Sequence, residues 1–285
     1  MSAPTLAVRG VVHRYGATLA LDVEDLVIGP GTTALLGPNG SGKSTLLRLL
    51  ATVRAPQAGS VRIGGLDPTD PVARVSVRRR LGYQTQSGGL PGRMRVDAFC
   101  DYVGALKEIP TARLRRRWTH WVLQRVALAE ASRRRIRTLS GGMQRRLALA
   151  QALIGLPRLL VLDEPLASLD AEQRAAMAFL LADRSPEATI VVASHHPDEL
   201  AGVAGQMVVL REGRVVFAGP PTSLAEQARG RVWETSTPVP GAACRTVGPD
   251  RVRCVAPGLP PAAVPMAPTV QDGYLAVLQR DPWRG

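Results

Sequence analysis

The segment GPNGSGKST, residues 37–45, constrains the fold of this chain more than any other stretch of its sequence. It follows a short apolar run with strand character, TTALLG (32–37), and leads into STLLRLLATV (44–53), whose apolar residues have helical spacing. A strand, a glycine-rich loop and a helix in this order are the context of a phosphate-binding loop, or P-loop. The sequence therefore predicts an α/β fold that binds a nucleotide.

The use of lysine supports this prediction. Of the 36 lysine and arginine residues, only Lys43 and Lys107 are lysine, and Lys43 occupies the lysine position of the motif G-x-x-x-x-G-K-S/T. Random placement would put a lysine there roughly one time in eighteen. A compact ammonium fits between phosphates, whereas a planar guanidinium is too wide. Ser44 offers a hydroxyl to Mg²⁺. We assign nucleotide binding to Gly37, Pro38, Asn39, Gly40, Ser41, Gly42, Lys43 and Ser44.

Two further apolar strands end in polar residues. RLLVLDEP (158–165) ends in Asp163 and Glu164, and ATIVVASHH (188–196) ends in two histidines. In a parallel sheet, ligands bind at the C-terminal ends of the strands. We therefore expect Asp163 to hold the Mg²⁺ shell, Glu164 to polarise a water for attack on the γ-phosphate, and a histidine to lie nearby. Capping of the next helix is the ordinary alternative for the acidic pair.

A second segment suited to anions lies at SGGMQRRLALAQAL (140–153). Ser140, Gly141 and Gly142 offer a hydroxyl and bare backbone N–H groups at the positive end of a helix dipole. One nucleotide needs only one phosphate loop. The second segment therefore raises the question of whose phosphate it binds.

Together these motifs resemble the ATP-binding subunit of ABC transporters, over about residues 4–228. The resemblance rests on the order of the P-loop, GYQTQ (82–86), LSGGMQRR (139–146), LLVLDEP (159–165), ASLD (167–170) and SHH (194–196). It implies a head-to-tail dimer in which the LSGG segment of one subunit binds the γ-phosphate held by the P-loop of another. The sequence has no internal repeat, so the partner is a second copy or a related ATPase chain.

The resemblance also implies roles for single residues. Tyr15 stacks on adenine, Thr45 joins Lys43 and Ser44 at the phosphates and Mg²⁺, and Asp170 lies in the loop that crosses to the partner. Gln86 contacts Mg²⁺ and water and responds to the membrane subunit. His195 senses the γ-phosphate.

Two of these assignments have an alternative in the sequence. His195 is preferred to His196 because ASHHPDEL then aligns with the acidic helix of the family. Gln84 is the second choice to Gln86. Met143 departs from the glutamine that many members carry after LSGG.

The expected organisation is a P-loop NTPase of the ABC ATPase type over residues 1–229, followed by a proline-rich, small β/α extension at 230–285. The first part comprises a β-rich opening subdomain, a mixed or parallel core sheet and a helical insertion at about 87–138. In the resembled family this insertion meets an integral membrane permease. Phe99, Trp118 and Trp121 are candidate contacts, although core packing explains each of them better.

The end of the chain bears on the direction of transport. APTVQDGYLAVLQ (267–279) resembles an ending found on ATPase subunits of ABC-2 exporters of drugs, antibiotics and lipids. We therefore expect an ATP hydrolase that powers export of a drug, antibiotic, peptide or lipid, with import as the alternative. An ABC ATPase acting on a ribosome or nucleic acid would carry two such domains, zinc cysteines or a coiled coil. No nucleic-acid partner is expected, and a free-standing P-loop kinase would lack LSGG.

Charge, apolar runs and cysteine content together predict a cytoplasmic location. The net charge is +13, no apolar run approaches the about 18–20 residues that span a bilayer, and the N-terminus lacks a secretory signal. Cys100, Cys244 and Cys254 suggest no disulfide framework, so reduced thiols are expected. We expect a cytoplasmic protein that reaches the inner face of the cell membrane through its permease.

Overall fold

A six-stranded sheet forms the centre of the molecule. The computed structural model describes residues 5–85, 89–167, 169–184, 188–260 and 263–279. The strand order is β5-β6-β7-β3-β8-β9, and only β9 runs antiparallel to its neighbour. The strands are β3 (Gly31–Leu36), β5 (Leu81–Gln84), β6 (Leu159–Asp163), β7 (Thr189–Ser194), β8 (Gln206–Arg211) and β9 (Arg214–Gly219).

Both faces of this sheet are covered, which is why its central strands are mostly apolar, as in residues 34–36 and 190–193. Leu35 and Val161 point to a core shared with α1 (Lys43–Leu50). Leu36 and Leu162, one residue along, point to the opposite core, which is shared with α5 (Gly141–Leu153). Polar functional groups are therefore confined to the strand ends.

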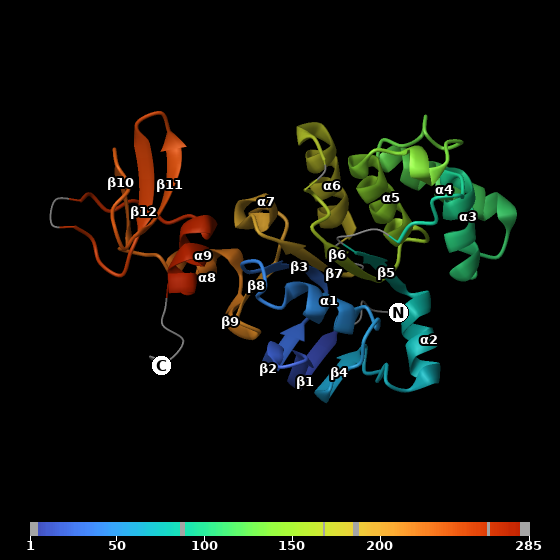
Figure 1. The fold of residues 1–285 in the computed structure, drawn as a ribbon, viewed down its shortest axis with the longest axis horizontal. Helices are drawn as coiled ribbons and strands as arrows, with labels where there is room; N and C mark the ends of the chain where they lie inside the picture. Colours follow the sequence, from blue (N-terminus) through green and yellow to red (C-terminus); the bar gives the residue numbers. More distant parts are fainter. Residues whose placement is uncertain (1–4, 86–88, 168, 185–187, 261–262, 280–285) are drawn as a thin grey trace.

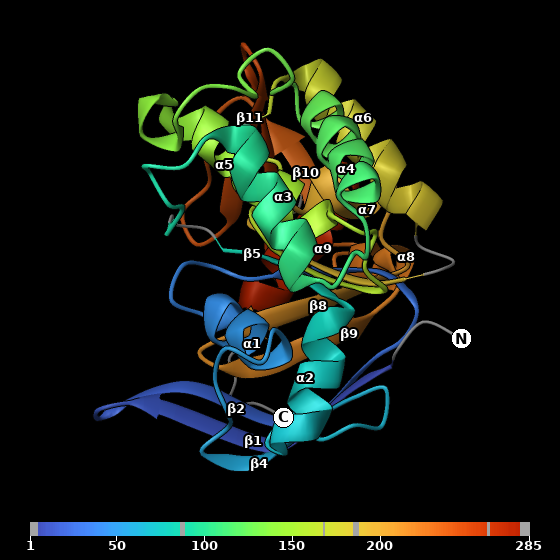
Figure 2. The same ribbon diagram turned by 90° about the vertical axis from the view of Figure 1, so that its right-hand side faces the viewer.

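A smaller antiparallel sheet lies on the α1 side, with the order β2-β1-β4. Its strands are β1 (Leu6–Tyr15), β2 (Thr18–Ile28) and β4 (Ala58–Ile63). Leu6, Val8 and Leu21 share a core with α1. Figure 2 shows this sheet on one side of the six-stranded sheet and α3 to α6 on the other.

Helices make up most of the segment between β5 and β6. They are α3 (Val96–Leu106), α4 (Ala112–Arg125), the single turn η1 (Ile136–Thr138) and α5, while α2 (Pro71–Arg79) precedes β5. Phe99 is buried, and Trp118 and Trp121 are partly buried against the same core. The helices α6 (Ala171–Arg184) and α7 (Pro197–Ala201) follow β6 and β7.

The C-terminal part packs beside the sheet edge at β8 and β9 (Figure 1). After α8 (Pro221–Glu226) come three antiparallel strands in the order β10-β12-β11, and then α9 (Val270–Gln279). These strands are β10 (Val232–Thr235), β11 (Ala243–Gly248) and β12 (Arg251–Val255). A buried ion pair of 2.7 Å between Arg253 and Asp272 joins the strands to α9. Arg211 Nη1 donates to the Leu278 carbonyl at 2.7 Å.

The expectation of reduced thiols is wrong for two of the three cysteines. Cys244 and Cys254 form a disulfide. They are directly opposite each other in the register of β11 and β12, with Cα atoms 4.1 Å apart, which brings the two side chains together on one face of the sheet. Cys100 is a free buried thiol, and burial raises its pKa to about 12. In the described part of the chain, no helix is both long and apolar enough to cross a membrane.

Candidate functional site

The loop between β3 and α1 is folded around the side chain of Lys43. Lys43 Nζ donates to the carbonyls of Gly37 at 2.7 Å and Pro38 at 3.0 Å. Gly42 has φ 102°, and a Cβ there would lie 2.5 Å from the Ala20 carbonyl, so glycine is required. Burial lowers the pKa of Lys43, although the charges of Glu164 and Asp163 oppose that shift. The loop thus holds a partly desolvated cation at the start of a helix, as binding of a polyphosphate requires.

Ser44 and Asp163 meet beside this loop. Ser44 Oγ donates to Asp163 Oδ2 at 3.0 Å, and Asp163 is 4% exposed at the end of β6. Burial raises the pKa of Asp163, while the bond from Ser44 and the charge of Lys43 oppose the rise. A buried carboxylate in this state favours the approach of a cation.

Glu164 and His195 form a second polar pair. His195 Nδ1 lies 2.9 Å from Glu164 Oε1. The Glu164 N–H donates to the Ala193 carbonyl at 3.1 Å, and its φ of 53° is in the left-handed region. The backbone strain that this conformation stores is typical of functional sites. His196, the other candidate histidine, is exposed, and its N–H donates to Ser194 Oγ at 3.0 Å.

Two cavities adjoin these pairs. The nucleotide cavity has a volume of about 550 Å³. It is lined by Tyr15, Thr18, Leu19, Ala20, Asn39, Gly40, Ser41, Gly42, Lys43, Ser44, Thr45, Asp163 and Glu164. A neighbouring cavity of about 360 Å³ is lined by Asn39, Gln84, Arg145, Asp163, Glu164, Ala167 and His195. Because both include Asn39, Asp163 and Glu164, they form one continuous site.

Orphaned polar atoms in these cavities fit a phosphate-bound metal. Ser41 Oγ and Gln84 Oε1 are buried and have no hydrogen-bond partner among the described residues. The described residues contain no group of three or more His, Cys, Asp or Glu that could cage a metal on its own. Mg²⁺ commonly takes one or two carboxylates and completes its shell with substrate phosphates and water. Ser44 and Asp163 suit that arrangement.

Gln84, the second choice of glutamine from the sequence, lines the second cavity. Strand β5 ends at Gln84, and Gln86, the first choice, lies outside the described residues. Gln84 pairs in register with Leu162, one residue before Asp163, and is 2% exposed. Arg145 of α5 also lines the second cavity and was missed, because nothing in the sequence separates it from the many other arginines.

The LSGG segment does not reach its own P-loop cavities. Ser140 caps α5, its Oγ accepting the Met143 N–H at 3.3 Å. Ser140 and Gly141 are exposed, and neither they nor Gly142 line the two cavities. Asp170 is exposed as well, and its Oδ1 accepts the Gln173 N–H at 2.8 Å. These residues are open to a partner.

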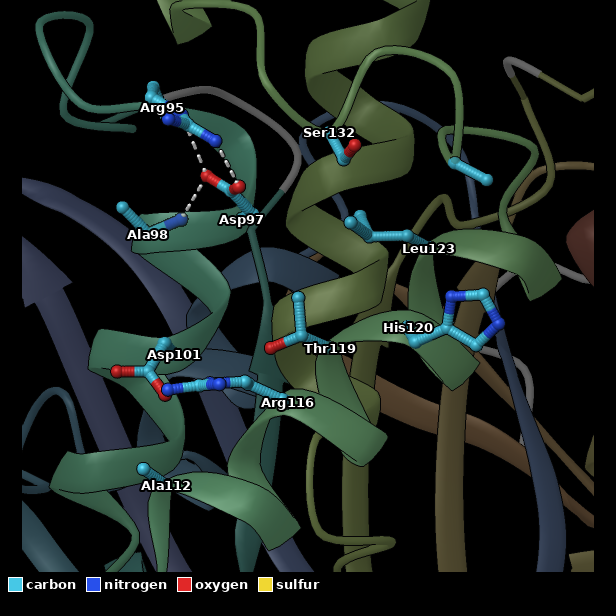
Figure 3. A pocket seen from close by; sticks show the side chains of 11 residues that line it. Arg95, Asp97, Ala98, Asp101, Ala112, Arg116, Thr119, His120, Leu123 and Ser132 are labelled. Atoms are coloured by element: carbon cyan, nitrogen blue, oxygen red, sulfur yellow. Dashed lines mark hydrogen bonds and ion pairs between the residues drawn. The ribbon is translucent and has the colours of Figure 1, made fainter.

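A separate cavity of about 600 Å³ lies between α3 and α4 (Figure 3). Arg95 and Asp97 pair with each other at one end, and Arg116, Thr119 and His120 line it from α4. Thr119 Oγ1 is buried without a hydrogen-bond partner among the described residues. None of the predicted nucleotide-site residues lines this cavity.

Comparison with known proteins gives one family. A family model described as "ABC transporter" matches residues 25–167. The chain is 38% identical over 234 residues to the nickel import ATP-binding protein NikO of Rhodobacter capsulatus, across 76% of this chain and 89% of that protein. It is 35% identical to the molybdenum import ATP-binding protein ModC of Albidiferax ferrireducens, across 77% of this chain and 59% of that protein.

A third relative is the Fe(3+) ions import ATP-binding protein FbpC of Pseudomonas fluorescens. The identity is 39%, across 67% of this chain and 55% of that protein. The chain thus spans a little over half the length of the molybdenum and iron relatives.

Solved structures share the fold. An ATP-binding subunit of an ABC transporter has a TM-score of 0.70 at 23% identity and covers 78% of this chain and 92% of that chain. A dimeric structure of MJ0796, a bacterial ABC transporter cassette, has a TM-score of 0.68 at 24% identity. The match covers 75% of this chain and 98% of the MJ0796 chain.

Proposed function

This chain belongs to the ABC transporter family as an ATP-binding, ATP-hydrolysing subunit, and we propose that it powers a membrane permease that imports its cargo. The predicted fold class, a P-loop ABC ATPase, is confirmed. The observation that carries the proposal is the 38% identity to the nickel import protein, which extends over 89% of that protein.

The proposed direction of transport, import, differs from the export that we expected from the sequence. The ending at 267–279 suggested an ABC-2 exporter, but the three relatives named above are all import proteins, which favours the alternative of import. Those relatives carry nickel, molybdenum and iron(III) in their names. The three relatives agree in the direction of transport but differ in cargo. The proposal therefore covers the direction of transport and not the cargo.

In the proposed reaction, ATP lies in the nucleotide cavity with its phosphates on the P-loop. When bound, Mg²⁺ neutralises charge on the β- and γ-phosphates, and Ser44 and Asp163 would hold it. Lys43 places its ammonium at the same phosphates. Glu164 orients and polarises the attacking water, and the contact from His195 Nδ1 fixes the direction of the Glu164 carboxylate. Gln84 Oε1, which has no hydrogen-bond partner within the described ranges, is offered to the water or metal shell.

The exposed LSGG segment supports a dimer. We propose that Ser140, Gly141 and Gly142 bind the γ-phosphate held by a second copy or a related ATPase chain in head-to-tail orientation. Asp170 would contact the same partner. The exposed N-terminus of α5 presents the required backbone N–H groups.

The permease would dock on the helical segment, at the inner face of the cell membrane. Phe99, one of the expected contacts, is 6% exposed and does not line the cavity between α3 and α4. We place the contact at the cavity between α3 and α4, where the Thr119 hydroxyl has no hydrogen-bond partner in the described part of the chain (Figure 3). Thr119→Leu should replace the hydroxyl by a larger apolar side chain in this cavity and reduce stimulation of the ATPase by the permease, whereas basal hydrolysis should persist.

Direction can be tested in proteoliposomes that contain the chain and its permease. ATP added outside serves only complexes whose ATPase faces the bath. An importer then moves cargo from the lumen to the bath, and an exporter accumulates it in the lumen. Nickel, molybdenum and iron(III) are the first cargoes to supply, in the lumen for one set of vesicles and in the bath for another, with Glu164→Gln as the inactive control. ATP-dependent accumulation in the lumen would overturn the proposal of import.

A further inference from the structure

The backbone next to Tyr15 is tied to the segment that follows α1. The Arg14 N–H donates to Gln57 Oε1 at 2.6 Å, and Gln57 Nε2 donates to the Arg14 carbonyl at 3.2 Å. One side chain therefore holds both main-chain groups of the residue before Tyr15. The position of the Tyr15 backbone depends on the connection between α1 and β4, residues 51–57.

The ring of Tyr15 is held on three sides. Burial raises the pKa of the Tyr15 hydroxyl, but hydrogen bonding to Thr45 and Arg48 on α1 and the charge of Arg54 outweigh burial and lower it. His13 packs edge-on at 5.1 Å between ring centroids, and Arg54 Cζ lies 5.1 Å from the Tyr15 ring centroid.

Arg54 and Tyr15 line different cavities. Tyr15 lines the nucleotide cavity, and Arg54 does not. Arg54 instead lines a separate cavity of about 240 Å³ together with Arg74 and Arg78. Arg54 is exposed, and among the described residues it has no ion-pair partner that would compete with the Tyr15 ring. A cation over one face of an aromatic ring draws electron density from the other face, where an electron-rich purine would stack.

We propose that Arg54 is a positioning residue for the nucleobase, acting through the face of Tyr15 opposite to it. The inference rests on the proposed nucleotide site and assigns binding of the base at that site to a sandwich of purine, Tyr15 and Arg54. Gln57 and Arg48 hold the Tyr15 ring in the position that this stacking requires. Arg54 itself touches neither phosphate nor metal.

The test compares a ligand with a base and a ligand without one. Calorimetry with Mg-ADP and with inorganic pyrophosphate avoids both hydrolysis and ATP-driven dimerisation. Arg54→Met should weaken ADP binding by about two- to five-fold, the range expected for a cation–π contact at an exposed site, and leave pyrophosphate binding unchanged. Arg54→Lys should retain most of the affinity. In steady-state assays Arg54→Met should raise KM for ATP with little change in kcat.

Two controls make the result specific. Arg74→Met removes a cation from the same neighbouring cavity and should leave ADP binding unchanged. In a Tyr15→Ala background, Arg54→Met should have no further effect on ADP. Three results would overturn the inference. Arg54→Met could weaken pyrophosphate binding as much as ADP binding, or it could leave ADP binding unchanged. It could also weaken ADP binding further in the Tyr15→Ala background. Failure of the unmodified chain to bind either ligand would instead overturn the proposed nucleotide site.

Discussion

Glu164 and His195 are joined by a 2.9 Å contact between Oε1 and Nδ1, although 31 residues separate them in the sequence. They follow the adjacent parallel strands β6 and β7, in which Asp163 pairs with Ala193. The Glu164 side chain is 13% exposed and that of His195 is 50% exposed. The carboxylate is thus sheltered at the cavity, while the imidazole stays accessible to a partner.

Glu164→Gln should leave ATP binding intact and reduce turnover at least about 10²-fold, because the amide keeps the shape of the carboxylate but is not a base. ATP that is bound and not hydrolysed should hold two subunits together. Size-exclusion chromatography should therefore show a dimer with ATP and a monomer without it.

The matched control for this substitution is Glu172→Gln, which alters an exposed glutamate in the first turn of α6. Glu172→Gln should hydrolyse ATP at the rate of the unmodified chain and should not be trapped as an ATP-bound dimer. Hydrolysis by Glu164→Gln at the unmodified rate would remove Glu164 from the reaction.

Lys43→Arg should be almost as damaging as Lys43→Ala. The ammonium of Lys43 lies 2.7 Å from the Gly37 carbonyl and 3.0 Å from that of Pro38, in a loop too narrow for a guanidinium. Equilibrium binding of a fluorescent ATP analogue should weaken at least about 10-fold in both variants, against an unaffected Arg78→Lys control. Near-normal affinity in Lys43→Arg would show that the loop does not enclose phosphates.

Sequence patterns predicted the region of the site better than its details. Continuous apolar strands that end in polar residues indicated that Asp163, Glu164 and a histidine would meet, because parallel strands end on one edge. The choice between Gln84 and Gln86 depends on where β5 stops pairing with β6, and periodicity does not fix that point. The Cys244–Cys254 bond depends on the register of two strands, and the Arg54–Tyr15 contact on a loop of irregular backbone. None of these has a local sequence signal.

Lys107 should make stability depend on alkaline pH. Burial lowers its pKa from 10.5 to about 8, and its Nζ donates to the Ile154 carbonyl at 2.8 Å. The unfolded chain therefore binds more protons than the folded chain between about pH 8 and 10.5. Within that window the folded state gains stability as pH rises, since the cost of burying the charge disappears. Below about pH 8, the free-energy cost of burying the Lys107 charge is fully present.

Urea unfolding of the unmodified chain and of Lys107→Met at pH 7.5 and pH 10 would measure this effect. Other groups titrate equally in both proteins, so the difference between them isolates Lys107. The unmodified chain should gain stability relative to Lys107→Met on going to pH 10. A constant difference would mean that Lys107 is as well solvated when folded as when unfolded.

Ser140 lies at the exposed N-terminus of α5. If Ser140 and Gly142 act on the nucleotide of a partner, Ser140→Arg and Lys43→Ala should each be inactive alone. Mixed, they can form a heterodimer with one site that pairs an intact P-loop with an intact LSGG, while the other site carries both substitutions. ATPase activity should return on mixing, to about half per heterodimer if the sites act independently and to less if they are coupled. If LSGG served the ATP of its own chain, no mixture could rebuild a site. Two separate Lys43→Ala preparations, mixed at the same concentration, must stay inactive, and absence of recovery in the first mixture would count against action in trans.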